Sequence, residues 1–225
     1  ALMREAYVDF SRYDIEGLDT SGYAFYHQLE EESYHGDLVT NIFAGGTVDT
    51  ERAFLTGYTD LWNFRTNTNS YGWYFGSQGY TVEGSHPSYD WFYNRRNVNG
   101  YLGIPTYYFL ENRYSELSPV TIAPDSILFQ EIYNLYAANR DGAGGPYFSF
   151  NVTYQGHGPY DTEEVWRGDH YTDGRYSTET ANIVDNYLGS VADTAEQLAV
   201  LVDRLRQEKR QVVLVVFGDH KPWLG

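Results

Sequence analysis

The stretch VVLVVFGDHKPWLG, residues 212–225, predicts a buried strand that ends on a charged turn. Residues 212–217 are apolar and mostly β-branched, which is typical of a strand inside a sheet. Gly218 then opens a turn that carries Asp219 and His220. A carboxylate oxygen and an imidazole nitrogen together suit Mn2+, Zn2+ or Mg2+. An isolated Asp-His pair is more often an ordinary hydrogen-bonded turn, but the preceding buried strand favours a metal site.

Strands and helices alternate along the rest of the chain. Further strands are expected at residues 1–3, 38–43 and 146–153. Helices are expected at residues 49–55 (capped by Asp49 or Thr50), 91–102, 125–139 (capped by Asp125) and 177–207 (with a break near Gly189). Residues 66–87 are expected to form a loop with one short strand. This order predicts one α/β domain over residues 1–225, with helices flanking a mostly parallel central sheet.

Polar side chains follow four of the expected strands. Glu5 follows the first, Thr47 the second, His157 the third, and the Asp219-His220 pair the last. In parallel sheets, ligands bind beyond the carboxyl ends of the strands. The sequence therefore predicts a site where these residues meet.

Thr47 lies behind two glycines in AGGTVDTE, residues 44–51. Glycines let the backbone approach an oxyanion, and free N–H groups at a helix start favour phosphate. A hydroxyl beside a metal can become a nucleophile. The alternative is an ordinary threonine cap, which is common. The stretch is not a P-loop, because no Gly-Lys-Ser/Thr follows.

Two other segments carry groups that suit phosphate. His157 lies between glycines in QGHGPY, residues 155–160, and could bind phosphate or donate a proton. Arg95 and Arg96 lie in FYNRRN, residues 92–97, and an arginine fork matches phosphate oxygens. The alternatives are an incidental turn histidine and a solvated arginine pair.

Composition excludes several classes of function. The net charge of −16, from 31 acidic and 15 basic residues, disfavours nucleic acid as a partner. The chain has no cysteine, so disulfides and thiolate chemistry are excluded. No apolar run reaches the roughly 20 residues of a membrane span, and no signal peptide is visible. The 23 tyrosines suit polar clefts and wet surfaces.

Several motifs, taken in order, resemble one family. They are MREAYVDF (3–10), GGTVDTERAFLTG (45–57), FYNRRNV (92–98), QGHGPY (155–160), NYLGSVADTAEQLAVLVDRL (186–205) and VFGDHKPWLG (216–225). Together they resemble the extracellular domain of the lipoteichoic acid synthase and phosphoglycerol transferase family, within the sulfatase and alkaline phosphatase-like superfamily. The resemblance implies that the chain is cut at both ends of the domain and that transmembrane helices belong upstream.

The resemblance also implies roles for individual residues. Glu5, Thr47, Asp219 and His220 would hold one divalent metal, Mn2+ or Mg2+, and Thr47 would be the nucleophile. The residues that would bind the substrate are Arg95, His157, Tyr93 and His86. Tyr93 stands where the family often has Trp, and Ser88 stands where it has Asp, a loss for which His86 would compensate.

The implied activity is transfer of glycerophosphate from phosphatidylglycerol, through a covalent threonine intermediate. The acceptor would be a glycerol-phosphate polymer, a glycolipid or a glycan. The full-length protein would be membrane-anchored, with this domain on the outer face of the bacterial cytoplasmic membrane. The alternatives are a sulfatase, a phosphodiesterase, a phosphoethanolamine transferase or a non-catalytic domain that binds the cell envelope. A sulfatase is disfavoured, because it needs Cys or Ser where Thr47 stands.

Overall fold

The computed structural model describes residues 1–40, 42–60, 63–142 and 144–225 and contains one five-stranded sheet. Its strands are β1 (Leu2–Arg4), β2 (Thr81–Ser85), β3 (Thr106–Tyr108), β4 (Tyr147–Val152) and β5 (Val216–Gly218). They lie in the order β3-β2-β4-β1-β5, and every pairing is parallel. The expected α/β fold with a parallel central sheet is therefore confirmed.

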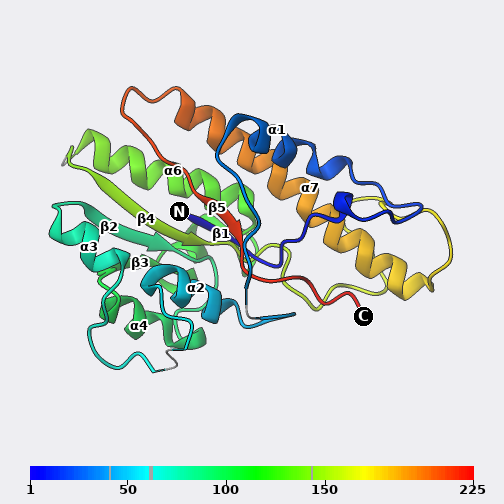
Figure 1. Cartoon of the computed structure of the whole chain (residues 1–225), viewed down its shortest axis with the longest axis horizontal. Helices are drawn as coiled ribbons and strands as arrows, with labels where there is room; N and C mark the ends of the chain where they lie inside the picture. The colour runs from blue at the N-terminus through cyan, green and yellow to red at the C-terminus, as the bar shows by residue number, and fades with distance from the viewer. Residues whose placement is uncertain (41, 61–62, 143) are drawn as a thin grey trace.

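Helices cover both faces of the sheet. The main ones are α1 (Ala24–Glu32), α2 (Thr47–Thr56), α3 (Tyr71–Ser77), α4 (Arg95–Tyr101), α6 (Asp125–Asp141) and α7 (Thr178–Arg206). Shorter helical segments are η1 (Phe10–Arg12), η2 (Ser21–Tyr23), η3 (Phe92–Asn94), η4 (Leu110–Tyr114) and α5 (Ser115–Leu117). Figure 1 shows α1, α6 and α7 on one face and α2, α3 and α4 on the other.

Alternation along β1 divides the core into two parts. Leu2 packs into the cluster under α6 and α7, whereas Met3 packs into the cluster under α2 and α4. Successive strand residues point to opposite faces, so a central strand buries apolar side chains on both sides. Because β1 lies between β4 and the edge strand β5, the residue that follows it, Glu5, emerges at the carboxyl edge of the sheet beside the end of β5.

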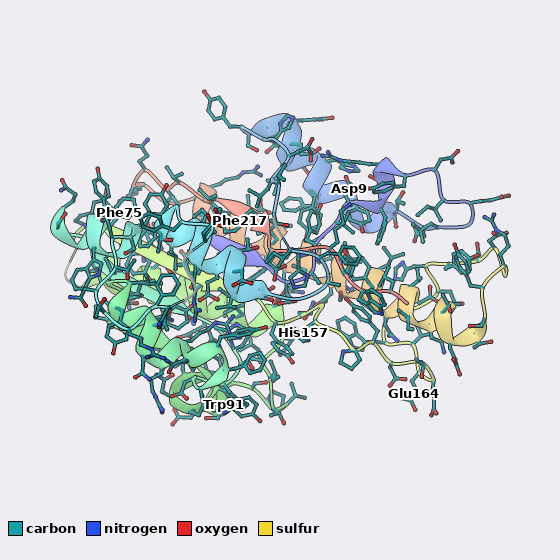
Figure 2. All side chains as sticks on the ribbon, turned by 60° about the horizontal axis from the view of Figure 1, so that its bottom comes forward. Asp9, Phe75, Trp91, His157, Glu164 and Phe217 are labelled. Carbon is teal, nitrogen blue, oxygen red and sulfur yellow. The ribbon has the colours of Figure 1, made fainter. Side chains whose placement is uncertain are left out.

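Aromatic stacking fixes α2 against the sheet. The ring of Phe54 lies 4.4 Å from that of Phe217 and 5.5 Å from that of Phe150. Further along the same face, Phe75 stacks on Phe148 at 4.5 Å. Figure 2 labels Phe75 and Phe217 among these side chains. Such pairs contribute roughly 0.5–1.5 kcal/mol beyond the area they bury. They place the first turn of α2 beside the strand ends.

One strand prediction is wrong, and another is wrong in extent. Residues 38–40 and 42–43 form no strand, and residue 41 lies outside the described part of the chain. Leu38, Val39 and Phe43 are exposed, because the segment has no neighbouring strand to pair with. At the other end, the expected strand 212–217 begins only at Val216. Its neighbour β1 is three residues long, so the preceding valines have no ladder to join.

The helix that carries Thr47 begins earlier than expected. It starts at Thr47 and its cap is Gly46, so neither Asp49 nor Thr50 caps it. The Thr50 hydroxyl instead donates to the carbonyl of Asp219. Likewise Asp125 is the first residue of α6, whose cap is Pro124. In both cases a tertiary partner takes the side chain that the local pattern assigned to capping.

Three further segments differ from expectation. Residues 66–87 contain the expected short strand, β2, but also helix α3, which the side chain of Ser70 caps. The expected helix 91–102 is divided, because Tyr93 and Asn94 are left-handed and α4 starts at Arg95. Helix α7 runs without a break through Gly189, where a side chain would collide with Arg167. No helix among the described residues is long and apolar enough to cross a membrane.

Candidate active site

The structure brings Glu5, Thr47, Asp219 and His220 together at the carboxyl edge of the sheet. The Thr47 hydroxyl donates to Oε2 of Glu5 at 3.2 Å and lies 3.2 Å from Nε2 of His220. That same nitrogen lies 3.4 Å from Oε1 of Glu5 and 3.2 Å from Oδ2 of Asp219. All four residues are buried. The turn after β5, the end of β1 and the start of α2 thus converge on one point.

Asp219 is rigidly held and yet keeps one oxygen without a partner. Its Oδ1 accepts from the backbone N–H groups of Ala6 and His220, both at 2.8 Å. Among the described residues, its Oδ2 has no hydrogen-bond donor, although it is buried. Leaving a buried acceptor unsatisfied costs about 1–3 kcal/mol, and more for a charged group. This oxygen therefore indicates a missing positive partner.

Nε2 of His220 faces the same point. Its Nδ1 lies 2.9 Å from the carbonyl of Lys221. A carbonyl can only accept, so Nδ1 carries a proton, and Nε2 is the nitrogen that would offer its lone pair to a cation that displaces its own proton. An imidazole held in this way is typical of metal ligands, whose other nitrogen donates to a backbone carbonyl.

The donor set fits a divalent cation. Ligand atoms of Glu5, Asp219 and His220 all lie within 4.8 Å of one another. The Thr47 hydroxyl contacts two of these three groups. Two carboxylates, a hydroxyl and one imidazole suit Mn2+ and also Mg2+, which accepts nitrogen less readily. A cation bound here would partner the orphaned Oδ2 of Asp219.

The pKa values in the group reflect crowded negative charge. Burial, together with the nearby carboxylate of Glu5, raises the pKa of Asp219 to about 7. Burial acts to lower the pKa of His220, but hydrogen bonding to Glu5 and the charge of Asp219 raise it to about 9. Without a metal, protons bound to this group of residues offset the buried negative charge of the carboxylates. A bound cation would perform the same neutralisation.

A left-handed turn delivers Thr47 to the site. Gly45 and Gly46 have φ values of 115° and 80°. A side chain at Gly46 would meet Cγ2 of Ile42 at 2.8 Å, so glycine is required there for space as well as for its backbone angle. Thr47 is the first residue of α2, where N–H groups lack partners within the helix. The hydroxyl is thus held at the positive end of a helix dipole.

Arg95 is tied to the same helix. It is only 2% exposed, and its Nε and Nη2 both lie 2.9 Å from Oε2 of Glu51 in α2. Its guanidinium also lies 5.2 Å from the centre of the Tyr93 ring. The alternative of a solvated arginine pair fails for Arg95, whereas Arg96 is exposed and pairs with Asp90. The structure therefore places Arg95 and Tyr93 together, beside the helix that begins with Thr47.

His86 follows β2 and His157 follows β4, and the rings of both lie near that of Tyr154. The Tyr154 ring lies 6.1 Å from that of His86 and stacks on that of His157 at 4.8 Å. Burial, and then the charge of Arg95, lower the pKa of His86 well below its usual value, so this ring is neutral. His157 is exposed and pairs with the carbonyl of Gly158. Within the described residues, neither histidine hydrogen-bonds to Glu5, Thr47, Asp219 or His220.

Sequence reasoning missed several residues that support the site. Thr50, Glu51 and Arg52 extend from α2 to Asp219, Arg95 and the Tyr93 carbonyl, respectively. Thr50 and Glu51 follow Thr47 by three and four positions, a spacing that places them on the helix face of Thr47 and was a signal for their role. Gln155 was also missed. It accepts from the N–H of Asp125 and donates to Asp193, contacts that no local pattern could reveal.

Comparison with known proteins adds a family and a fold. The Sulfatase family model matches residues 9–225. A relative from Rhizobium meliloti (strain 1021), named "Putative cyclic beta-1,2-glucan modification protein", is 27% identical over 200 residues. That alignment covers 84% of this chain and 31% of the relative. The chain thus spans about a third of the curated relative that it matches.

Two solved structures have a similar fold. The lipoteichoic acid synthase LtaP from Listeria monocytogenes matches with a TM-score of 0.77 and 16% identity, over 98% of this chain and 55% of that one. The Streptococcus pyogenes phosphoglycerol transferase GacH, solved with sn-glycerol-1-phosphate, has a TM-score of 0.77 and 19% identity, over 100% and 61%. Identities this low establish the fold alone. Since the family model covers nearly the whole chain, the chain belongs to the Sulfatase family and has the fold of sulfatases and alkaline phosphatases.

Proposed function

We propose that this domain is a metal-dependent phosphoglycerol transferase that acts in the cell envelope. Its donor would be phosphatidylglycerol, and its product an acceptor hydroxyl that carries glycerophosphate. The observation that carries this proposal is the position of the Thr47 hydroxyl, at the start of α2 and 3.2 Å from both Glu5 and His220. Thr47 is not the cap of α2, because Gly46 occupies the cap position. Its buried hydroxyl instead lies among side chains of the kinds that bind metal ions.

Glu5, Thr47, Asp219 and His220 would hold one Mn2+ or Mg2+ ion. When bound, such an ion lowers the pKa of a coordinated hydroxyl and offsets negative charge on phosphoryl oxygens. The protein itself positions the ligand side chains. The backbone contacts of Asp219 and the Lys221 carbonyl fix the two ligands of the last turn before any substrate arrives. Rigid placement of this kind is what catalytic sites need.

In the first step, Oγ1 of Thr47 attacks the phosphorus of the donor. The bond from phosphorus to the diacylglycerol oxygen breaks, and a glycerophosphoryl-threonine forms. The proton lost by the Thr47 hydroxyl ends on the departing diacylglycerol oxygen. Arg95 would bind a phosphoryl oxygen, because its guanidinium keeps N–H groups beyond those that Glu51 uses. Such positioning supplies most of the catalysis in phosphoryl transfer.

In the second step, an acceptor hydroxyl attacks the same phosphorus. The bond to Thr47 breaks, and the acceptor proton returns to Oγ1. The acceptor would be a glycerol-phosphate polymer, a glycolipid or a glycan. Tyr93, His86 and His157 would contact the glycerol group or the phosphate, since the Tyr93 ring lies against Arg95 and both histidine rings lie near Tyr154. The neutral His86 would act as a hydrogen-bond partner rather than as a cation.

Other members of the superfamily fit less well. A sulfatase that forms its nucleophile from cysteine is disfavoured, because the chain has no cysteine. A non-catalytic binding domain would have no need for a buried Asp219 oxygen without a donor, which costs stability. The fold shared with phosphoglycerol transferases also supports the proposal, although it does not by itself identify the substrate. We place the domain on the outer face of the cytoplasmic membrane, where such a donor is available.

Peptide mass spectrometry tests the proposal directly. The full-length protein is incubated with phosphatidylglycerol vesicles and Mn2+, and the peptide that spans residues 44–52 is analysed. We expect a glycerophosphoryl adduct on Thr47 that disappears with a chelator and in Thr47→Ala. Thr56→Ala, in the last turn of the same helix, is the matched control and should keep the adduct. Bound metal without either adduct or released diacylglycerol would rule out this donor.

A further inference from the structure

A row of aromatic side chains extends outward from Arg95. We call Tyr89, Trp91, Phe92 and Tyr93 the aromatic strip. Neighbouring rings lie 5.4 Å apart for Tyr89 and Trp91, 5.7 Å for Trp91 and Phe92, and 4.4 Å for Phe92 and Tyr93. Trp91 is 59% exposed and Phe92 is 37% exposed. Figure 2 shows Trp91 projecting at the surface of the layer that contains α4.

The strip is held in a strained backbone. Tyr93 and Asn94 have φ values of 56° and 57°, and neither is glycine. Each left-handed residue costs about 1–2 kcal/mol. Arg52 of α2 stabilises the turn by donating to the Tyr93 carbonyl at 2.8 Å. Strain that a protein maintains in this way is commonly found at functional sites. Here it turns large apolar rings toward solvent, at a position linked to the Thr47 helix.

We propose that the aromatic strip binds the acceptor and that this acceptor is a neutral glycan. The proposal rests on the transferase function above and identifies the acceptor class of that same site. The C–H faces of pyranose rings stack on the negative faces of aromatic rings, which offer a rigid, partly apolar surface. Polar groups that suit sugar hydroxyls occur in the same segment: Asp90, which pairs with Arg96, and Asn94, which accepts from Asn97. A chain of sugars lying along the strip would reach from Trp91 toward Tyr93 and Arg95.

Charge favours a neutral acceptor over a polyanion. The chain carries a net charge of −16. Arg96, an exposed cation adjacent to the strip, is paired with Asp90 at 3.1 Å. A glycerol-phosphate polymer requires arrays of unpaired Lys and Arg, as other polyphosphate partners do. The same negative charge disfavours docking of the strip on an anionic bilayer. A neutral glycan experiences neither repulsion.

Binding measurements test the strip without relying on catalysis. The full-length protein is titrated with a neutral cyclic β-1,2-glucan, with a glycerol-phosphate polymer and with phosphatidylglycerol vesicles. We expect the natural protein to bind the glucan, and Trp91→Ala to weaken this binding about tenfold. Tyr34→Ala removes a fully exposed aromatic residue outside the strip and serves as the control, with unchanged affinity. In a transfer assay, the Trp91→Ala change should raise KM for the glucan.

Three results would overturn the inference. The first is a natural protein that does not bind the glucan. The second is a Trp91→Ala variant that binds the glucan as tightly as the natural protein does. The third is a Trp91→Ala variant that loses affinity for the polymer or the vesicles instead of the glucan. Formation of the Thr47 adduct tests the proposed function separately, so failure of the inference and failure of that function can be distinguished. Adduct formation without glucan binding would leave the transferase intact and remove the glycan acceptor. Glucan binding that depends on Trp91, without an adduct, would keep the strip and remove the phosphatidylglycerol donor.

Discussion

The hydroxyl oxygen of Thr47 lies 3.2 Å from Nε2 of His220, although 173 positions separate the two residues in the chain. The contact forms because parallel strands deliver their carboxyl ends to one edge of the sheet, while the Phe54–Phe217 stack sets α2 at the same edge. Both groups are buried, so water competes little for them. The predictions below test this arrangement and its supports.

Metal binding should stabilise the protein. The buried carboxylates of Glu5 and Asp219 repel each other, and a cation would neutralise them. At a Mn2+ concentration of about 100 times Kd, the free energy of unfolding should rise by about 2.7 kcal/mol. Thermal unfolding with and without a chelator measures the effect. Asp219→Ala should abolish the Mn2+-dependent shift, whereas the exposed Asp141→Ala should keep it. An equal shift in both variants would place the ion elsewhere.

Glu51→Gln should destabilise the fold and impair catalysis. It leaves the buried guanidinium of Arg95 without its carboxylate, and breaking a buried pair in this way costs about 3–5 kcal/mol. Urea unfolding measures the loss. Asp90→Asn breaks the exposed pair with Arg96 and should cost less than about 1 kcal/mol. Similar losses in the two variants would contradict the structural role given to Glu51.

Gly46→Ala should lower the rate of adduct formation on Thr47. The new methyl group would approach Ile42 and shift the turn before Thr47, in addition to about 1–2 kcal/mol of backbone strain. Gly57→Ala, at the other end of α2, is a matched control. Its φ of 75° imposes similar strain, but no atom lies within 4 Å of the added carbon. Single-turnover rates should fall in Gly46→Ala only. A comparable fall in Gly57→Ala would attribute the effect to helix stability.

Asp125 should make stability depend on pH. Burial raises its pKa to about 7, despite the hydrogen bond from Thr194. In the unfolded chain the carboxyl has a pKa of about 3.9. Between these values the folded protein keeps a proton that the unfolded chain has released. The free energy of unfolding therefore falls as pH rises, by up to about 1.4 kcal/mol per unit.

The variant Asp125→Asn keeps the shape of the protonated carboxyl and cannot ionise. Its stability relative to the natural protein should increase from about pH 4 to pH 7 and then level off. Urea unfolding at several pH values measures the difference. Asp141→Asn removes an exposed carboxyl whose pKa Arg140 lowers, so its difference should stay flat across this window. A flat difference for Asp125→Asn as well would show that its pKa is not raised.

Local pattern was sufficient for much of the fold. The periodicity of α7 and α6 and the alternation in β4 predicted those elements to within a few residues, because their apolar faces are long and regular. Residues 38–43 have the same kind of pattern and form no strand. A strand is stable only when a neighbour supplies its hydrogen bonds, and the pattern of one segment does not reveal whether a neighbour exists.

The sequence by itself predicted which residues form the candidate site. Polar residues after the expected strands and the resemblance carried by the motifs both pointed to Glu5, Thr47, Asp219 and His220, because few residue types can bind a hard cation or act as nucleophiles. Only the tertiary structure decided that Arg95 is buried against Glu51 and that Tyr93 turns through a left-handed conformation. It also left Oδ2 of Asp219 without a donor. These properties depend on partners distant in the chain, and packing alone brings such partners within hydrogen-bonding range.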